Sequence, residues 1–297
     1  MSDSQLHVSH STFFGGCQRL FEKADYVVVG VPFDATSTYR TGARFAPLAI
    51  REASLNIETH SFRSNIDVED LKIHDLGDLH VSGDVKQTLS RLSSTVRELV
   101  EAKKTPILIG GEHTLTLGAM RGIGGNDAAV LSFDAHLDLR QKYMDLTTSH
   151  TTFMRRLNEQ VKPRRIVEVG TRAVCREELK YAKEAGIQQF TAIRVREDGC
   201  EAIAKAIKEA VKDCTKIYLT IDMDVLDPAF APAVQNPEPD GLSTRTLLDI
   251  LLNLCDERLA CLDLVEVAPP YDQGVTAVQA ARILFEALCR IEKARKL

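Results

Sequence analysis

Three short clusters of histidine and aspartate are the residues of this sequence best suited to chemistry. They are His113, then Asp134, His136 and Asp138, then Asp222 and Asp224. Each cluster follows or ends an apolar run of the kind that forms a buried strand. Carboxylates and imidazoles at such strand ends are costly to desolvate unless a positive charge lies beside them. The pattern therefore predicts a site for bound cations.

The spacing within the clusters indicates which cations. If the backbone stays extended, alternate side chains of Asp134-x-His136-x-Asp138 point to one side, and those of Asp222-x-Asp224 do the same. Oxygen-rich sets with a little imidazole suit Mn²⁺, Mg²⁺ or Fe²⁺ better than a thiolate-preferring site does. Bridging carboxylates would let the set hold two ions, and two ions about 3.5–4 Å apart acidify a bridging water and clamp a tetrahedral intermediate. The sequence thus predicts a hydrolytic site with two metals.

Each motif alone also fits an ordinary role. A lone Asp-x-Asp is usually a turn or a solvated strand end, and short motif matches carry false positives. Three clusters at the ends of separate apolar strands favour a metal site. A calcium-binding EF-hand is excluded because Leu226 and Asp227 stand where an oxygen ligand and a glycine are needed. No dinucleotide fingerprint, phosphate-binding loop or Gly-x-Ser-x-Gly motif appears.

The bulk composition excludes several classes of partner. The chain has 297 residues, a net charge of −5 and no basic stripe, so we expect no nucleic-acid partner. No apolar run reaches about 18 residues, so we expect no membrane span. The polar N-terminus lacks the hydrophobic region of a signal peptide, which predicts a cytoplasmic location. Seven scattered cysteines without a C-x-x-C pair are expected to be reduced and structural.

Strand-like apolar runs alternate with helix-like segments along the whole chain. Strands are expected at 26–31, 107–110, 128–133, 165–170, 217–221 and 262–267, and helices at 89–100, 202–211, 247–254 and 276–296. Ser243 is a candidate cap for the third helix. Alternation without a Pro/Gly/Ser-rich linker predicts one α/β domain over residues 1–297 with a mostly parallel sheet. Ligands of such sheets bind beyond the carboxyl ends of the strands, where all three clusters begin.

These motifs resemble, in order, those of the ureohydrolases, the family of arginases and agmatinases. The matching segments are residues 30–34, 40–47, 110–114, 133–138, 221–232 and 266–272, which extend over nearly the whole chain. The pattern after Asp138 is similar to that of archaeal-type agmatinases. The resemblance implies a three-layer α/β/α fold with a mostly parallel sheet of about eight strands. It also implies a homo-trimer or homo-hexamer.

The resemblance further implies two Mn²⁺ ions in each subunit. The first ion would be held by His113, Asp134, Asp138 and Asp222, and the second by Asp134, His136, Asp222 and Asp224. A hydroxide that bridges the ions would attack the guanidinium carbon of the substrate, and the products would be urea and an amine. Asp138 would pass a proton to the leaving nitrogen.

Two further residues match functional positions of the family. His150 resembles a loop histidine that shuttles protons or orients the substrate; without the family it also fits an ordinary loop histidine. Glu266 resembles the carboxylate that binds the guanidinium group, for which a bidentate pair is geometrically suited. On its own, Glu266 also fits a solvent-exposed strand end. The polar turn at 39–44 fits either a surface loop or a subunit contact.

The substrate depends on positions where the chain departs from the family. Gln235, Asn236 and Asp240 replace residues of a Gly-Thr-Pro and Gly-Gly pattern in a loop that lies near the substrate, so Asn236 is a candidate substrate-binding residue. After Asp138, where arginases carry an asparagine, this chain has Arg140 and Lys142, either of which can bind a substrate carboxylate if it faces the pocket.

We expect agmatine as substrate and putrescine as product. The alternatives are arginine, which would give ornithine, and aminopropylagmatine or 4-guanidinobutyrate. A metal-dependent deacetylase with one zinc ion, in which His113 would be superfluous, is a remote alternative. A non-catalytic relative is another, although such a protein would more often have lost a ligand.

Overall fold

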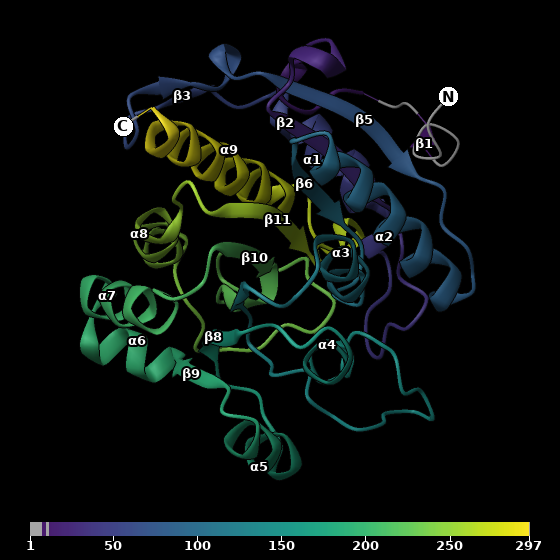
Figure 1. The fold of residues 1–297 in the computed structure, drawn as a ribbon, viewed down its shortest axis with the longest axis vertical. Helices are drawn as coiled ribbons and strands as arrows, with labels where there is room; N and C mark the ends of the chain where they lie inside the picture. Colours follow the sequence, from purple (N-terminus) through teal and green to yellow (C-terminus); the bar gives the residue numbers. More distant parts are fainter. Residues whose placement is uncertain (1–7, 10–11, 297) are drawn as a thin grey trace.

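The computed structural model describes residues 8–9 and 12–296, and a nine-stranded sheet forms its centre (Figure 1). The strands lie in the order β1-β5-β2-β6-β11-β10-β7-β8-β9. Their bounds are β1 (Val8–Ser9), β2 (Tyr26–Val31), β5 (Ile73–Leu79), β6 (Thr105–Gly110), β7 (Ala128–Phe133), β8 (Arg165–Thr171), β9 (Gln188–Thr191), β10 (Lys216–Asp222) and β11 (Leu259–Val265). Only the short β1 pairs antiparallel within this sheet, so the expected mostly parallel sheet is confirmed. The short strands β3 (His60–Ser61) and β4 (Ile66–Asp67) pair separately.

The helices cover both faces of the sheet. One face carries α1 (Ala46–Ser54), α6 (Ala192–Asp198), α7 (Cys200–Ala210), α8 (Thr244–Leu254) and α9 (Val275–Arg295). The other face carries α2 (Val85–Glu101), α3 (Leu115–Ile123), α4 (Phe153–Gln160) and α5 (Arg176–Glu184). Each face has its own apolar core, as expected for a three-layer α/β/α protein. The four helices predicted from spacing lie within or nearly coincide with α2, α7, α8 and α9.

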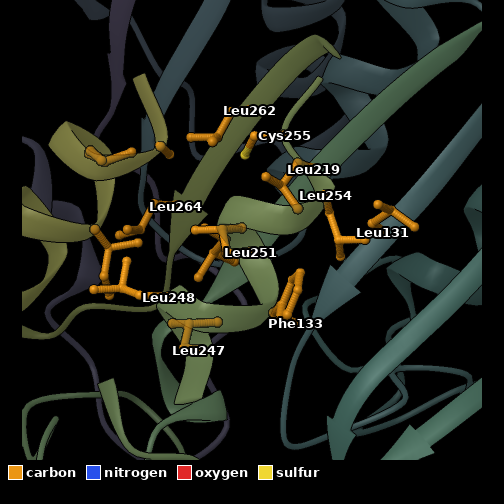
Figure 2. Close-up of a cluster of buried hydrophobic side chains, with 14 of the residues drawn as sticks. Leu131, Phe133, Leu219, Leu247, Leu248, Leu251, Leu254, Cys255, Leu262 and Leu264 are labelled. Atoms are coloured by element: carbon orange, nitrogen blue, oxygen red, sulfur yellow. The ribbon is translucent and has the colours of Figure 1, made fainter. Parts of the chain in front are cut away.

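Helix α8 shows how the core holds the middle of the sheet (Figure 2). Ser243 caps the start of this helix, and its hydroxyl accepts the backbone N–H of Thr246 at 3.1 Å, as the sequence predicts. Leucines of α8, including Leu251, pack with Leu219 and Leu262 of the central strands β10 and β11. Burial of each of these leucine side chains stabilises the folded state by about 1.5–3 kcal/mol relative to leaving it exposed. This packing supports the strands whose ends carry the metal-ligand motifs.

Strand β5 was missed because its sequence is polar. Its Asp75 is buried and paired with the fully buried Arg51 of α1, with 2.8 Å between Arg51 Nε and Asp75 Oδ2. Arg51 also pairs with Asp78 at the end of the strand. A buried carboxylate is tolerated where a guanidinium compensates its charge. The strand therefore contains polar residues and lacks the apolar run from which a strand is predicted.

Parallel strands bring their carboxyl ends to one edge of the sheet. Strands β6, β11, β10 and β7 are consecutive neighbours, so the residues that follow them lie side by side. None of the helices in the described part of the chain has the length and hydropathy that a membrane crossing requires. All seven cysteines are free thiols.

Candidate metal centre

Two groups of histidine and aspartate meet beyond the carboxyl ends of β6, β7 and β10. One group consists of His113, Asp134 and Asp222, and the other of Asp134, His136 and Asp224. In each group, one potential ligand atom per residue lies within 4.8 Å of the others. Asp134 belongs to both groups, so its two carboxylate oxygens face two ion positions. The sixth predicted ligand, Asp138, has Oδ2 at 3.7 Å from His113 Nδ1.

The deeper group contains an imidazole nitrogen that has the environment of a metal ligand. His113 Nδ1 is buried and makes no hydrogen bond among the described residues, although Asp134 Oδ2 lies at 3.0 Å and Asp222 Oδ2 at 3.2 Å. Its other nitrogen, Nε2, lies 2.8 Å from Thr220 Oγ1. A hydrogen bond at Nε2 leaves the lone pair of Nδ1 for a cation. These residues therefore fit a divalent metal.

The outer group lies closer to solvent. His136 Nδ1 lies 3.0 Å from Asp224 Oδ2 and 3.5 Å from Asp134 Oδ1, while the side chain is 23% exposed. Its Nε2 faces Glu238, with 3.8 Å to Oε1. Asp134 Oδ1 also accepts the backbone N–H of His136 at 2.6 Å. The outer position therefore offers a similar ligand set with an opening to solvent.

The backbone does not stay extended through these motifs, contrary to the expectation from their period of two. Met223–Val225 is a turn of 3₁₀ helix, and Asp222 Oδ1 accepts the N–H of Asp224 at 2.8 Å. Such local side-chain bonds compete with extended structure. Asp138 adopts a φ of 50°, a conformation that is rare for residues other than glycine. As a result Asp222 and Asp224 enter different groups, and a bridging role for Asp222 stays a prediction.

Crowded carboxylates make the centre a strong acceptor of positive charge. Burial and the neighbouring Asp224 and Asp134 charges raise the pKa of Asp222 well above its ordinary value. Burial alone would lower the pKa of His113, but the carboxylates of Asp134, Asp138 and Asp263 together outweigh it and raise this pKa to about 9. The cluster therefore holds protons that bound cations would displace.

A buried polar network lies behind His113 and was not predicted. Thr220 and Thr116 have their hydroxyl oxygens 3.4 Å apart, and Thr116 Oγ1 donates to Asp263 Oδ2 at 2.7 Å. The Tyr218 hydroxyl donates to the same carboxylate oxygen. Partners of this kind fix the orientation of a ligating imidazole. Their types alone give no signal, because isolated threonines in buried helices and strands are common.

A cavity of about 590 Å³ opens directly above the two groups. It is lined by Asp138, Asp222 and Asp224 of the metal motifs and by all four predicted substrate-binding residues, Arg140, His150, Asn236 and Glu266. Glu266 follows β11 with a φ of 69°, and its Oε1 accepts the backbone N–H of His113 at 2.6 Å. Burial and the Asp222 charge raise the pKa of Glu266. Its strained backbone beside the cavity is typical of functional positions.

His150 and Arg140 occupy different parts of the cavity wall. His150 is 4% exposed, with Nδ1 at 3.6 Å from Glu266 Oε1. Burial and the charges of His136 and His113 lower the pKa of His150 to about 3, so its ring is neutral. The Arg140 guanidinium lies over the ring of Tyr143, at 4.9 Å from its centroid.

Arg172 braces the loop after β10 and was also missed. Its guanidinium donates to the carbonyls of Asp224 at 2.7 Å, Glu238 at 2.8 Å and Pro239 at 2.9 Å. These contacts join the metal motif to the loop that carries Asn236. One planar guanidinium can hold several carbonyls because its five N–H donors are fixed in one plane.

The segment after β2 also reaches the site. Thr38 and Tyr39 line the cavity, so the polar turn predicted as a surface loop or subunit contact begins at the cavity wall. Thr36 is tied to buried Glu112, whose Oε2 accepts the backbone N–H of Thr36 at 2.6 Å. Farther along, Asp240 takes a φ of 61° where a glycine was expected, which aspartate tolerates better than most residues.

Comparison with known proteins agrees with this geometry. The sequence profile of the arginase family matches residues 24–289. The chain belongs to the arginase family. The N(1)-aminopropylagmatine ureohydrolase of Thermococcus kodakarensis is 37% identical over 276 residues, which cover 92% of each chain. The agmatinase of Bacillus anthracis is 33% identical, over 90% of this chain and 92% of its own.

Solved structures of the arginase family have the same fold. The agmatine ureohydrolase of Thermoplasma volcanium matches with a TM-score of 0.89 and 34% identity, over 100% of this chain and 99% of its own. Proclavaminate amidino hydrolase from Streptomyces clavuligerus matches with a TM-score of 0.87 and 30% identity, over 97% and 99%. The ureohydrolase resemblance and the arginase-like fold are thereby confirmed, and the chain is a hydrolase of this family.

Proposed function

We propose that this protein hydrolyses agmatine to putrescine and urea with two Mn²⁺ ions. The observation that carries the proposal is the buried Nδ1 of His113, which has no hydrogen bond within the described part of the chain and lies between the carboxylates of Asp134 and Asp222 beneath a cavity. Manganese is favoured because the set is rich in oxygen and contains imidazole. When bound, such a pair of ions supplies an acidified water and electrostatic stabilisation of a tetrahedral carbon.

The chain's own residues would bind the substrate and move protons. Glu266 holds the guanidinium group by a charge-assisted pair, since its carboxylate lines the cavity close to the metal groups. Asp138 lies in the same cavity and delivers a proton to the departing amine nitrogen. His150 contacts the Glu266 side of the site and either orients the substrate or relays a proton.

The amine tail of agmatine suits the acidic part of the cavity wall. Glu178 and Glu238 line the cavity and add negative charge that attracts a cationic tail. The relatives named agmatinase and N(1)-aminopropylagmatine ureohydrolase support the same class of substrate. Arg140 favours a second candidate, a guanidino acid such as arginine or 4-guanidinobutyrate, because Arg140 lines the cavity and a guanidinium can bind a carboxylate.

A substrate panel tests the proposal. The Mn²⁺-loaded protein is incubated with agmatine, aminopropylagmatine, arginine and 4-guanidinobutyrate, and urea is measured. We expect the highest kcat/KM for agmatine and loss of turnover in Glu266→Gln, which keeps the size of the side chain. Preference for a guanidino acid that disappears in Arg140→Gln would favour the second candidate. No urea from any compound would contradict the proposal, and one bound zinc with intact activity in His113→Asn would favour a deacetylase.

Three further expectations complete the proposal. One sheet joins strands from Val8–Ser9 to Leu259–Val265, which supports a single domain. Exposed apolar side chains on and beside α1 and at the start of α9 support a homo-trimer or homo-hexamer; they are Phe45, Leu48, Leu55, Val275 and Val278. Light scattering after size-exclusion chromatography measures the mass and would reveal a monomer instead. The cytoplasmic location stays a prediction that cell fractionation can check.

A further inference from the structure

Two amide side chains cross from the loop after β10 to the segment after β2. Gln235 Nε2 donates to Ser37 Oγ at 2.5 Å, and Asn236 Nδ2 donates to Thr38 Oγ1 at 3.3 Å. Gln235 and Asn236 are two of the positions at which this sequence departs from the family pattern. The two hydrogen bonds are therefore made by residues in which this chain differs from the family pattern, and not by residues of the metal motifs.

Only one of the two crossings reaches the candidate catalytic histidine. Thr38 Oγ1 lies 3.0 Å from His150 Nε2. On the other side of the ring, His150 Nδ1 faces Glu266 Oε1 at 3.6 Å. The ring therefore lies between a hydroxyl and a carboxylate, and it is almost completely buried.

The hydrogen bonds from Asn236 through Thr38 to His150 can all be donated in the same direction. The Asn236 amide nitrogen can only donate, so the Thr38 oxygen accepts from it, and the proton of the Thr38 hydroxyl is available to His150 Nε2. When the Thr38 hydroxyl donates to Nε2, the single N–H of the neutral imidazole is at Nδ1. That proton points toward the Glu266 carboxylate, which is an acceptor. The opposite tautomer would place an imidazole lone pair against the carboxylate.

We propose that Thr38, supported by Asn236, is a positioning residue that holds His150 in the tautomer with its proton on Nδ1. This inference rests on the proposed guanidino hydrolysis for its kinetic consequence. The N–H of His150 then faces Glu266 at the wall of the cavity before the substrate reacts. Loss of the Thr38 hydroxyl would remove one hydrogen bond to His150 and the ring orientation that this bond fixes.

Kinetics of three variants test the role of Thr38. Thr38→Val keeps the shape of the side chain but removes the hydroxyl, and we expect kcat for the best substrate to fall about tenfold with KM changed less than about twofold. Thr38→Ser should restore kcat to within about twofold of the parent. Ser37→Ala breaks the neighbouring crossing without touching His150 and should leave kcat unchanged.

The pattern across these variants separates positioning from simple support of the loops. Equal losses in Ser37→Ala and Thr38→Val would overturn the proposal, because both would then act only by joining the two loops. Loss of kcat in Thr38→Ser as large as in Thr38→Val would also overturn it. Thermal unfolding of each variant checks that all four proteins are folded at the assay temperature.

A spectroscopic measurement does not depend on turnover. Two-bond ¹H–¹⁵N correlations of the full-length, Mg²⁺-loaded protein labelled at histidine nitrogens report which ring nitrogen of each histidine carries the proton. The His150 signals are identified by their loss in His150→Asn. We expect the Nδ1–H form in the parent and in Thr38→Ser, and a mixture in Thr38→Val.

Urea release and the His150 tautomer test the two proposals separately. A parent protein that releases no urea but shows the Nδ1–H form contradicts the proposed function and supports the positioning role. A parent that hydrolyses its substrate with His150 in the Nε2–H form overturns the positioning role and supports the proposed function.

Discussion

The two candidate ion positions share Asp134 but differ in depth. The deeper position is completed by His113, which is fully buried and backed by the Thr220 hydroxyl. The outer position is completed by His136, which is 23% exposed and faces Glu238 and the cavity. Similar ligands therefore serve in one case a closed site and in the other a site open to solvent.

This difference predicts unequal roles for the two ions. A fully buried ligand set with fixed partners loses little orientational freedom on binding and releases its ion slowly. A partly exposed histidine leaves room for water and for the reacting end of a substrate. We therefore expect the deeper ion to bind first and more tightly, and the outer ion to exchange.

The largest effect on metal content and activity is expected from substitution of Asp134, the residue that both ion positions share. Asp134→Ala removes a ligand from both groups, so metal content should fall from two ions to nearly none and the rate of urea release by at least about 1000-fold. Metal is measured by mass spectrometry after dialysis. Asp198→Ala, at an exposed aspartate paired with Arg194, is the matched control and should behave as the parent. An Asp134→Ala protein that keeps both ions would show that the positions are not joined through this residue.

Substitution of the two histidines should separate the positions. His136→Asn is expected to keep the deeper ion, while His113→Asn should retain less than one ion after the same dialysis. Both should lower the rate of urea release by at least about 100-fold, because hydrolysis needs the two ions together. If His136→Asn lost both ions and His113→Asn kept one, the assignment of the tighter site would be reversed.

A smaller effect is expected at the partner of the deeper histidine. Thr220→Val removes the hydroxyl 2.8 Å from His113 Nε2 and should weaken binding of the deeper ion by about 10–100-fold. Thr220→Ser should restore the affinity. Calorimetric titration with Mn²⁺ measures both steps, and unchanged affinity in Thr220→Val would remove the hydroxyl from any orienting role.

The smallest effect on metal affinity is expected for a change of one pH unit. Since the pKa of His113 in the metal-free protein is raised to about 9, the imidazole carries a proton below that pH and must lose it when a cation binds. Affinity for Mn²⁺ should therefore rise by up to about tenfold per pH unit as the pH increases toward 9. Titrations in buffers of different ionisation enthalpy measure the protons released, and release of none at pH 7 would contradict this.

The sequence predicted the metal-ligand motifs because their signals are local. An apolar run followed by Asp134 or Asp222 marks a buried strand end, and the parallel sheet brings these ends together. Glu266 also follows a strand, β11, but its role was expected from the family resemblance. The conformations inside the motifs were harder, because Asp138 adopts a positive φ and a 3₁₀ turn follows Asp222.

The supporting residues were beyond such reasoning. Arg172, Thr38 and Asp263 act through side chains that meet partners far away in the chain, and nothing in their neighbouring residues reports those meetings. Strand β5 was missed for a related reason, since Arg51 neutralises the aspartates that made the segment look like a loop. The local sequence pattern thus indicates which segments are buried and how they repeat. Which charged side chains pair with each other is seen only in the folded structure.

Anomalous diffraction from crystals grown with Mn²⁺ tests the central claim most directly. We predict two manganese peaks about 3.5–4 Å apart, one on each side of the Asp134 carboxylate, with the stronger peak beside His113. A single peak, or none between these aspartates and histidines, would contradict the account.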